Sequence, residues 1–168
     1  KPLWRRQGGA EDRRHAQQDR DHPEIASEKD RVLADGRQMS ERFKEWKPPE
    51  FDARGMTKWN WMCQYHENLQ LGNRTDIGAF TYINAKYGVD IQEEVQIGSH
   101  CSVYSWSTID DKKGRVTIKR NARVGSHSVV MPGVTIGESA VVGAFSFVTS
   151  DVPDNAAVAG VPARAIRV

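Results

Sequence analysis

The stretch VTIKRNARVGSHSVVMPGVTIGESAVVGAFSFV, from Val116 to Val148, repeats with a period of six residues. An aliphatic residue stands at every sixth position: Ile118, Val124, Val130, Ile136, Val142 and Val148. Helices repeat at about 3.6 residues and strands at about two, so neither element explains the pattern. A short flat strand followed by a corner does explain it, and three such sides close a triangular coil of about eighteen residues.

The same period extends upstream of Val116. It runs through Leu71, Ile77, Ile83 and Val89, slips by two residues, and resumes at Ile91, Ile97, Val103 and Ile109. The aliphatic side chains fill the prism, and the small residues that follow them suit tight corners. Successive coils pair strand on strand about 4.8 Å apart. The sequence therefore predicts a mainly β fold, a parallel β-helix of triangular cross-section over residues 69–168.

Two irregularities interrupt this β-helix. The slip lies in NAKYGVDI, residues 84–91, and predicts a bulged corner. The polar stretch STIDDKKGRVT, residues 107–117, predicts a loop that leaves the prism, and such loops often carry functional sites. A C-terminal tail is expected over residues 152–168.

The first fifty residues differ from the rest, since 12 are Lys or Arg and 11 are Asp or Glu. Residues 1–26 form a charged leader without periodicity, which predicts a segment that is either disordered or ordered only against a partner. Apolar residues at helical intervals then predict a helix from about Glu28 to Lys47, ended by Pro48-Pro49. Residues 27–68 are expected to hold this helix and an aromatic connector that covers one end of the main domain.

Composition limits the function classes. The net charge of +2 is spread along the chain and gives no reason to expect nucleic acid or a membrane surface as partner. No apolar run approaches the ~18 residues that span a bilayer. Cys63 and Cys101 lack a CxxC spacing, so we expect neither a disulfide framework nor a metal site. These observations favour a soluble, cytoplasmic protein.

Three motifs point to a known family: IGSHCSVYS, VGSHSVVMPGVTIGESAVVGAFSFVTSDVP and AGVPARAIRV. Together they resemble the hexapeptide-repeat acyltransferases with a left-handed β-helix, in the branch that acetylates sugars on oxygen or nitrogen. The resemblance covers about residues 69–168. It implies a homotrimer, acetyl-CoA as co-substrate in the groove between subunits, a sugar acceptor, and a role in surface-polysaccharide biosynthesis.

The resemblance also implies residues for the co-substrate. Ser126 matches a position near the acyl carbonyl, where it can stabilise an oxyanion. Gly125 and Gly143 have an alternative interpretation, since glycine also suits the tight corners of the coil without any contact to a ligand. The residues implied to contact coenzyme A are Gly125, Gly143, Ala144 and Ser146 beside the pantetheine arm, and Arg164 and Arg167 beside the phosphates.

The catalytic histidine of the sugar O-acetyltransferases has no counterpart, since Trp106, Ser107 and Thr108 occupy its place. His100 and His127 each stand three residues after an aliphatic residue. If the 107–117 loop is a pure excursion, the two histidines share a column, with Phe80 and Phe145 above and below. They are candidate bases and equally candidate packing residues at a subunit contact.

For the acceptor, relatives place polar residues at the positions of Asp76 and Asn84, while Tyr104 and Trp106 suit the walls of a sugar site. A hydroxyl acceptor needs a general base, whereas a neutral amine does not. The missing histidine therefore favours an amino sugar or nucleotide sugar.

Two alternatives stay open: a sugar O-acetyltransferase with His100 or His127 as base, and a catalytically inactive trimeric scaffold. A γ-class carbonic anhydrase would need three zinc-binding histidines, which the spacing of His66, His100 and His127 does not supply.

Overall fold

The computed structural model describes residues 31–32, 38–39 and 46–166, and the chain divides into two units, residues 1–41 and 42–168. In the first unit, β1 (Arg31–Val32) pairs antiparallel with β2 (Gln38–Met39). The helix expected over residues 28–47 is therefore wrong at these four positions. The sequence between the strands contains Asp35-Gly36, a dipeptide that favours hairpins over helices. The rest of that range up to residue 45, and the charged leader, lie outside the described residues.

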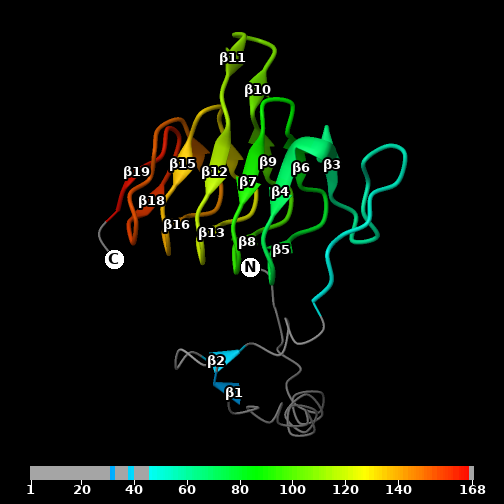
Figure 1. The fold of residues 1–168 in the computed structure, drawn as a ribbon. Helices are drawn as coiled ribbons and strands as arrows, with labels where there is room; N and C mark the ends of the chain where they lie inside the picture. Colours follow the sequence, from blue (N-terminus) through cyan, green and yellow to red (C-terminus); the bar gives the residue numbers. More distant parts are fainter. Residues whose placement is uncertain (1–30, 33–37, 40–45, 167–168) are drawn as a thin grey trace, which may run out of the picture. The chain divides into compact units, whose positions relative to one another are not determined.

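The second unit is a parallel β-helix with three sheets, seen from the side in Figure 1. The first sheet holds β4 (Leu69–Leu71), β7 (Val89–Ile91), β12 (Val116–Ile118) and β15 (Thr135–Ile136). The second holds β5 (Asp76–Ile77), β8 (Gln96–Ile97), β13 (Arg123–Val124), β16 (Val141–Val142), β18 (Ala157–Ala159) and β19 (Arg164–Ala165). The third holds β3 (Met62–Gln64), β6 (Tyr82–Asn84), β9 (Ser102–Tyr104), β14 (Val129–Val130) and β17 (Phe147–Val148). A short 3-10 helix, η3 (His66–Asn68), precedes β4.

The predicted aliphatic residues stack in register through the prism. In the first sheet, for example, Leu71 pairs with Ile91, Ile91 with Ile118, and Ile118 with Ile136. Ile91, Ile118 and Ile136 have no solvent exposure. Burying one such side chain contributes roughly 1.5–3 kcal/mol, so the column of aliphatic residues is the main source of stability. The mainly β fold class predicted from the sequence is confirmed.

Both interruptions of the period are present. The two-residue slip is absorbed in the corner between β6 and β7, because Leu71 pairs with Ile91 and Ile83 with Val103. The polar stretch forms the hairpin of β10 (Trp106–Ser107) and β11 (Lys112–Lys113), which projects from the prism in Figure 1.

Two details of that second interruption differ from the prediction. Ile91 pairs with Ile118, and Ile109, which the period placed inside, is 99% exposed in the hairpin. Val116 and Thr117 belong to β12, so the excursion begins and ends earlier than expected. The residues that follow Ile109 are polar and favour an exposed hairpin. Their preference for solvent decides the conformation, although Ile109 keeps the six-residue period.

The turns between the sheets form three corners, which we name by their side chains. The charged corner joins the first sheet to the second and includes residues 72–75, 92–95, 119–122 and 137–140. The aromatic corner joins the second sheet to the third and includes residues 78–81, 98–101, 125–128 and 143–146. The hairpin corner joins the third sheet to the first and includes residues 85–88 and 105–115, where both interruptions lie.

The connector before β3 contacts the first coils. Trp61 is 3% exposed, and the ring of Phe51 lies edge-on to it at 5.4 Å and stacks on His66 at 4.7 Å. Trp46 Nε1 donates a hydrogen bond to the carbonyl of Thr75 at 2.8 Å. Within the described part of the chain, none of the helices has the length and apolar character needed to cross a bilayer.

Candidate active site

The aromatic corner carries a ladder of four exposed rings, one from each coil. Phe80 lies 5.0 Å from His100, His100 stacks on His127 at 4.8 Å, and His127 stacks on Phe145 at 4.7 Å. Phe80 and Phe145 are 64% and 67% exposed. This confirms that the two histidines share one column between the two phenylalanines, because the hairpin is a pure excursion.

The local backbone explains why these rings point outward. All four residues have positive φ, between 57° and 63°, at the turn between two short strands. The next residue of each coil is small and buried, and its hydroxyl or thiol bonds to the corner backbone. Thr81 Oγ1 donates to Gly98 O at 2.9 Å, and Ser128 Oγ donates to Gly143 O at 3.0 Å.

The residues implied to contact the pantetheine arm lie at the same corner. The amides of Gly125 and Gly143 donate to Val142 O and Val158 O, so they belong to the sheet ladder. The neighbouring amides of Ser126 and Ala144 donate to no acceptor in the described residues. Ser146 is 2% exposed and its hydroxyl bonds to Gly143 O at 2.6 Å, which gives it a structural role. The corner thus offers two backbone donors beside the histidine ladder.

The two arginines are only partly located. Arg164 lies in β19, at the C-terminal end of the second sheet, and its exposed Nη1 donates to Ala163 O at 2.8 Å. Arg167 lies outside the described residues.

Three of the four acceptor candidates lie together. Asn84 and Tyr104 are on neighbouring strands of the third sheet, and Trp106 follows at the start of β10. The Tyr82 hydroxyl, which sequence reasoning did not select, donates to Gln64 Oε1 at 2.6 Å, accepts from Asn84 Nδ2 at 3.4 Å, and its ring lies 5.7 Å from Tyr104. Burial raises the pKa of Tyr82, so it stays a neutral phenol. Asp76 is in the second sheet, on another side of the prism.

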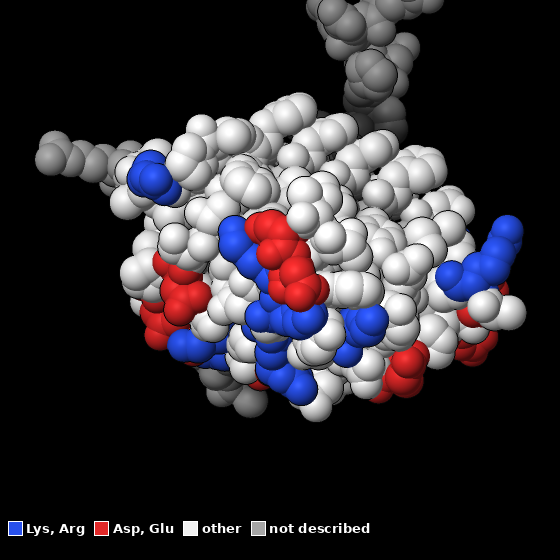
Figure 2. All heavy atoms as spheres, turned by 90° about the horizontal axis from the view of Figure 1, so that it is seen from above, with Lys and Arg blue, Asp and Glu red and all other residues white. Residues whose placement is uncertain are grey.

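The hairpin corner offers no free carboxylate base. Asp110 pairs with Lys112 at 2.8 Å, and hydrogen bonds from Lys112 and Ser107 lower its pKa to about 2. Asp111 pairs with Lys113 at 2.9 Å and accepts from Trp106 Nε1 at 3.2 Å, and its pKa is lowered as well. Figure 2, viewed from above, shows acidic and basic side chains gathered near the middle of this face, beside a wide uncharged area.

Lys86 is the residue of this corner that the sequence analysis missed. Its Nζ lies 3.6 Å from the centre of the Trp106 ring and 5.8 Å from that of Tyr65. Lys86 lies in the two-residue slip of the repeat. The slip predicts an irregular corner, but it does not indicate which side chain of that corner is exposed.

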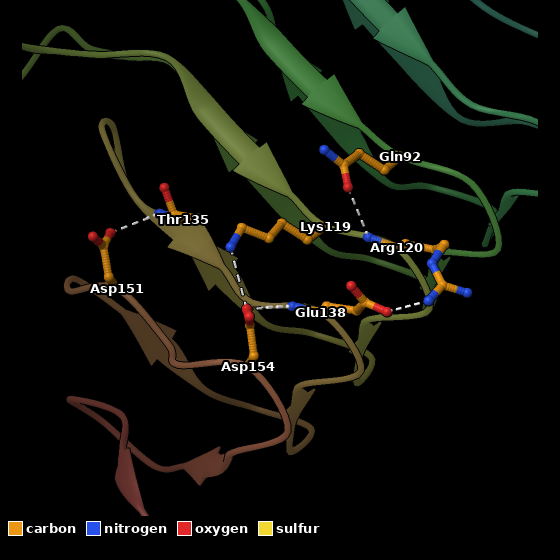
Figure 3. A network of polar contacts seen from close by, with 7 residues as sticks. All are labelled: Gln92, Lys119, Arg120, Thr135, Glu138, Asp151 and Asp154. Carbon is orange, nitrogen blue, oxygen red and sulfur yellow. Dashed lines mark hydrogen bonds and ion pairs between the residues drawn. The ribbon is translucent and has the colours of Figure 1, made fainter.

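The charged corner carries a network of internal polar contacts, part of which Figure 3 shows. Arg120 pairs with Glu138, and the Arg120 amide donates to Gln92 Oε1 at 3.0 Å. Asp154 accepts from Lys119 Nζ at 3.2 Å and from the Glu138 amide at 2.8 Å. These contacts join successive coils, so this corner is structural.

The cysteines do not contribute a nucleophile or a ligand. Both are buried. Burial, and to a smaller extent the negative charge of Glu67, raises the pKa of the Cys63 thiol to about 12. In the part of the chain that the structure describes, no three His, Cys, Asp or Glu side chains are grouped to hold a metal ion.

Comparison with known proteins identifies the repeat. Residues 115–150 match the family model described as bacterial transferase hexapeptide (six repeats). This part of the chain therefore carries the repeat of the hexapeptide transferases. This hexapeptide-repeat chain is 56% identical over 52 residues to the galactoside O-acetyltransferase of Escherichia coli K12, covering 31% of the chain and 26% of that protein. It is 30% identical over 110 residues to the serine acetyltransferase of Bacillus subtilis 168, covering 62% of the chain and 51% of the relative. The matches thus span about half or less of these curated relatives.

Solved structures agree on the fold. A hexapeptide-repeat acetyltransferase from Vibrio cholerae O1 biovar eltor, in complex with acetyl-CoA, superposes with a TM-score of 0.61 at 28% identity, covering 64% of this chain and 63% of that one. A galactoside acetyltransferase in complex with coenzyme A superposes with a TM-score of 0.57 at 32% identity, covering 64% of this chain and 57% of that one.

Proposed function

We propose that the protein is an acetyl-CoA-dependent acetyltransferase that acts on a sugar, with an amino sugar or nucleotide sugar as the favoured acceptor. The observation that carries this proposal is the aromatic corner. There the unpaired amides of Ser126 and Ala144 lie within residues 115–150, which match the hexapeptide transferase repeat. Two such donors on a rigid backbone suit the amide carbonyls and the thioester carbonyl of acetyl-CoA.

The acceptor is proposed to be an amine because the usual base is missing. The hairpin corner has no histidine, and its two aspartates are held as ion pairs by Lys112 and Lys113. A neutral amine attacks the thioester carbon, the thiolate of coenzyme A leaves, and the amine's extra proton passes to solvent or to the thiolate. No strong protein base is needed for that sequence.

The exposed ladder supports a homotrimer as part of this proposal. Four rings standing 4.7–5.0 Å apart at one corner present an apolar strip that a neighbouring prism would cover. Acetyl-CoA would then lie between two subunits, with Arg164 and Arg167 near its phosphates. A cytoplasmic location and a role in surface-polysaccharide biosynthesis complete the proposal.

The test is a paired measurement on the full chain. Acetyl-CoA binding is followed by calorimetry, and coenzyme A release is followed with amino sugars, plain hexosides and serine as acceptors. We expect turnover on amino sugars that survives His100→Ala and His127→Ala. If the protein binds no acetyl-CoA, the enzyme proposal is wrong and the inactive scaffold is correct.

The second candidate is sugar O-acetylation with His100 or His127 as base, because both imidazoles are exposed next to the free amide of Ser126. Turnover on a hexoside that falls about 100- to 10,000-fold in one histidine variant would establish it.

A further inference from the structure

The ammonium of Lys86 is held between two aromatic rings at the hairpin corner. Nζ lies over the indole of Trp106 at 3.6 Å and near the phenol of Tyr65 at 5.8 Å. The electron-rich ring faces attract a cation, so the two rings favour one position for the Lys86 ammonium.

The backbone of Lys86 is fixed by its neighbours. Its amide donates to Asn84 Oδ1 at 3.2 Å, and its carbonyl accepts from Asn68 Nδ2 at 3.4 Å. The next amide, that of Tyr87, donates to Ser105 Oγ at 2.9 Å. Lys86 is therefore presented on a rigid corner rather than on a mobile loop.

The charge of Lys86 has no anionic partner in the described part of the chain. The two nearby aspartates are taken by other lysines, Asp110 by Lys112 and Asp111 by Lys113. A partly buried ammonium with three donors and no acceptor is suited to a ligand that brings negative oxygens.

The surroundings of Lys86 indicate what else such a ligand carries. Tyr104, predicted to bind the acceptor, lies on the third sheet, and Trp106 offers an aromatic ring. Asn84, the neighbour of Tyr104 in that sheet, is buried and bonds to Tyr82 and to the Lys86 amide, so it positions this corner. Aromatic rings stack on the C–H faces of sugars, and phenol groups bond to their hydroxyls.

We propose that Lys86, with Trp106 and Tyr65, forms the subsite that binds an anionic group of the acceptor, a carboxylate or a phosphate, and so selects acidic sugars over neutral ones. This inference rests on the proposed function. It makes Lys86 a specificity-determining residue that lowers the KM for charged acceptors and leaves the chemical step unchanged.

The experiment compares three acceptors in the full-length protein: glucosamine, glucosamine 6-phosphate and 2-amino-2-deoxyglucuronic acid. Against Lys86→Gln we expect the KM of the charged acceptors to rise about 10- to 100-fold, the range for a lost charged hydrogen bond. The KM of glucosamine and all kcat values should change little. The two charged acceptors distinguish a phosphate from a carboxylate site.

A matched control exists at the connector, where Lys58 Nζ lies 4.6 Å from the ring of Trp59. Lys58→Gln removes the same kind of contact and should leave every KM unchanged, while Lys86→Arg should preserve selectivity. If Lys86→Gln raises the KM of neutral and charged acceptors equally, or leaves both unchanged, the subsite does not exist.

A second readout separates this inference from the proposed function. Calorimetry of glucosamine 6-phosphate and of glucosamine, without acetyl-CoA, measures the subsite even if no acceptor is turned over. Tighter binding of the phosphate that is lost in Lys86→Gln supports the subsite. Equal binding of the two sugars, or none, overturns it whether or not the protein is an acetyltransferase.

Discussion

The charged corner and the aromatic corner are built on the same backbone and carry opposite chemistry. In each coil, both corners place one residue at positive φ, as with Asn121 and His127. At the charged corner the side chains bond to the next coil, as Asn121 Nδ2 does to Ser139 Oγ at 3.0 Å. At the aromatic corner the rings stack on one another and stay exposed.

This difference separates structure from function within one repeat. A corner whose donors and acceptors are used internally has little left to offer a ligand. The aromatic corner leaves the amides of Ser126 and Ala144 unpaired and an apolar strip uncovered, which are the properties of a binding surface.

The largest expected effect comes from adding one methyl group at each corner. A Cβ at Gly125 would meet Ala144 N at 2.4 Å, and a Cβ at Gly137 would meet Asp154 N at 2.4 Å. Gly125→Ala and Gly137→Ala should therefore each lower the free energy of unfolding by about 1–3 kcal/mol in urea titrations.

Only the first of these changes should weaken acetyl-CoA binding, measured by calorimetry at a temperature where both variants are folded. Equal weakening by Gly137→Ala would mean that the two corners do not differ in function.

A medium effect is expected within the ring ladder. The rings of His127 and Phe145 are nearly parallel, with 2° between their planes. A double-mutant cycle with His127→Ala and Phe145→Ala should give a coupling of about 0.5–1.5 kcal/mol. The corresponding cycle for Asn121 and Ser139 at the charged corner serves as the comparison, and a coupling of zero between the rings would refute the stacking.

The smallest effect concerns acid stability at the charged corner. Hydrogen bonds from the Glu138 amide and Lys119 lower the pKa of Asp154 below its ordinary value of 3.8. Its contribution is therefore full above that value and is lost as pH falls through the lower folded pKa.

Asp154→Asn should be slightly less stable than the parent near neutral pH, and the two should converge in thermal unfolding as the pH falls through the lowered pKa of Asp154. A difference that persists at low pH would show that the carboxylate charge is not what stabilises this corner.

Most of the β-helix was predictable because one period encodes it. Ile118 and Ile136 follow from spacing alone, since positions in a solenoid repeat from coil to coil. The column of His100 and His127 followed only on the condition that the loop between them is a pure excursion. Ile109 shows the limit, because it keeps the period inside a segment whose polar residues prevent burial.

The candidate site was only partly predictable. Gly125, Ser126 and Ala144 could be placed at one corner because they lie in regular coils. Lys86 could not, since its direction depends on a two-residue slip and on a ring, Trp106, that a separate excursion brings over it. Asp76 and Asn84 are near in sequence yet lie on different sheets, because a corner stands between them.

The last strand of the prism bears on how copies of the molecule meet. Most strands of the three sheets run parallel, so an open last coil would offer a template on which another chain could add a further coil. Instead β19 turns back and pairs antiparallel with β18, Val158 opposite Ala165. The second sheet thus ends in an antiparallel strand of two residues that carries Arg164. Short edge strands and charged edge residues disfavour the addition of another chain, which is how β-proteins resist fibre formation.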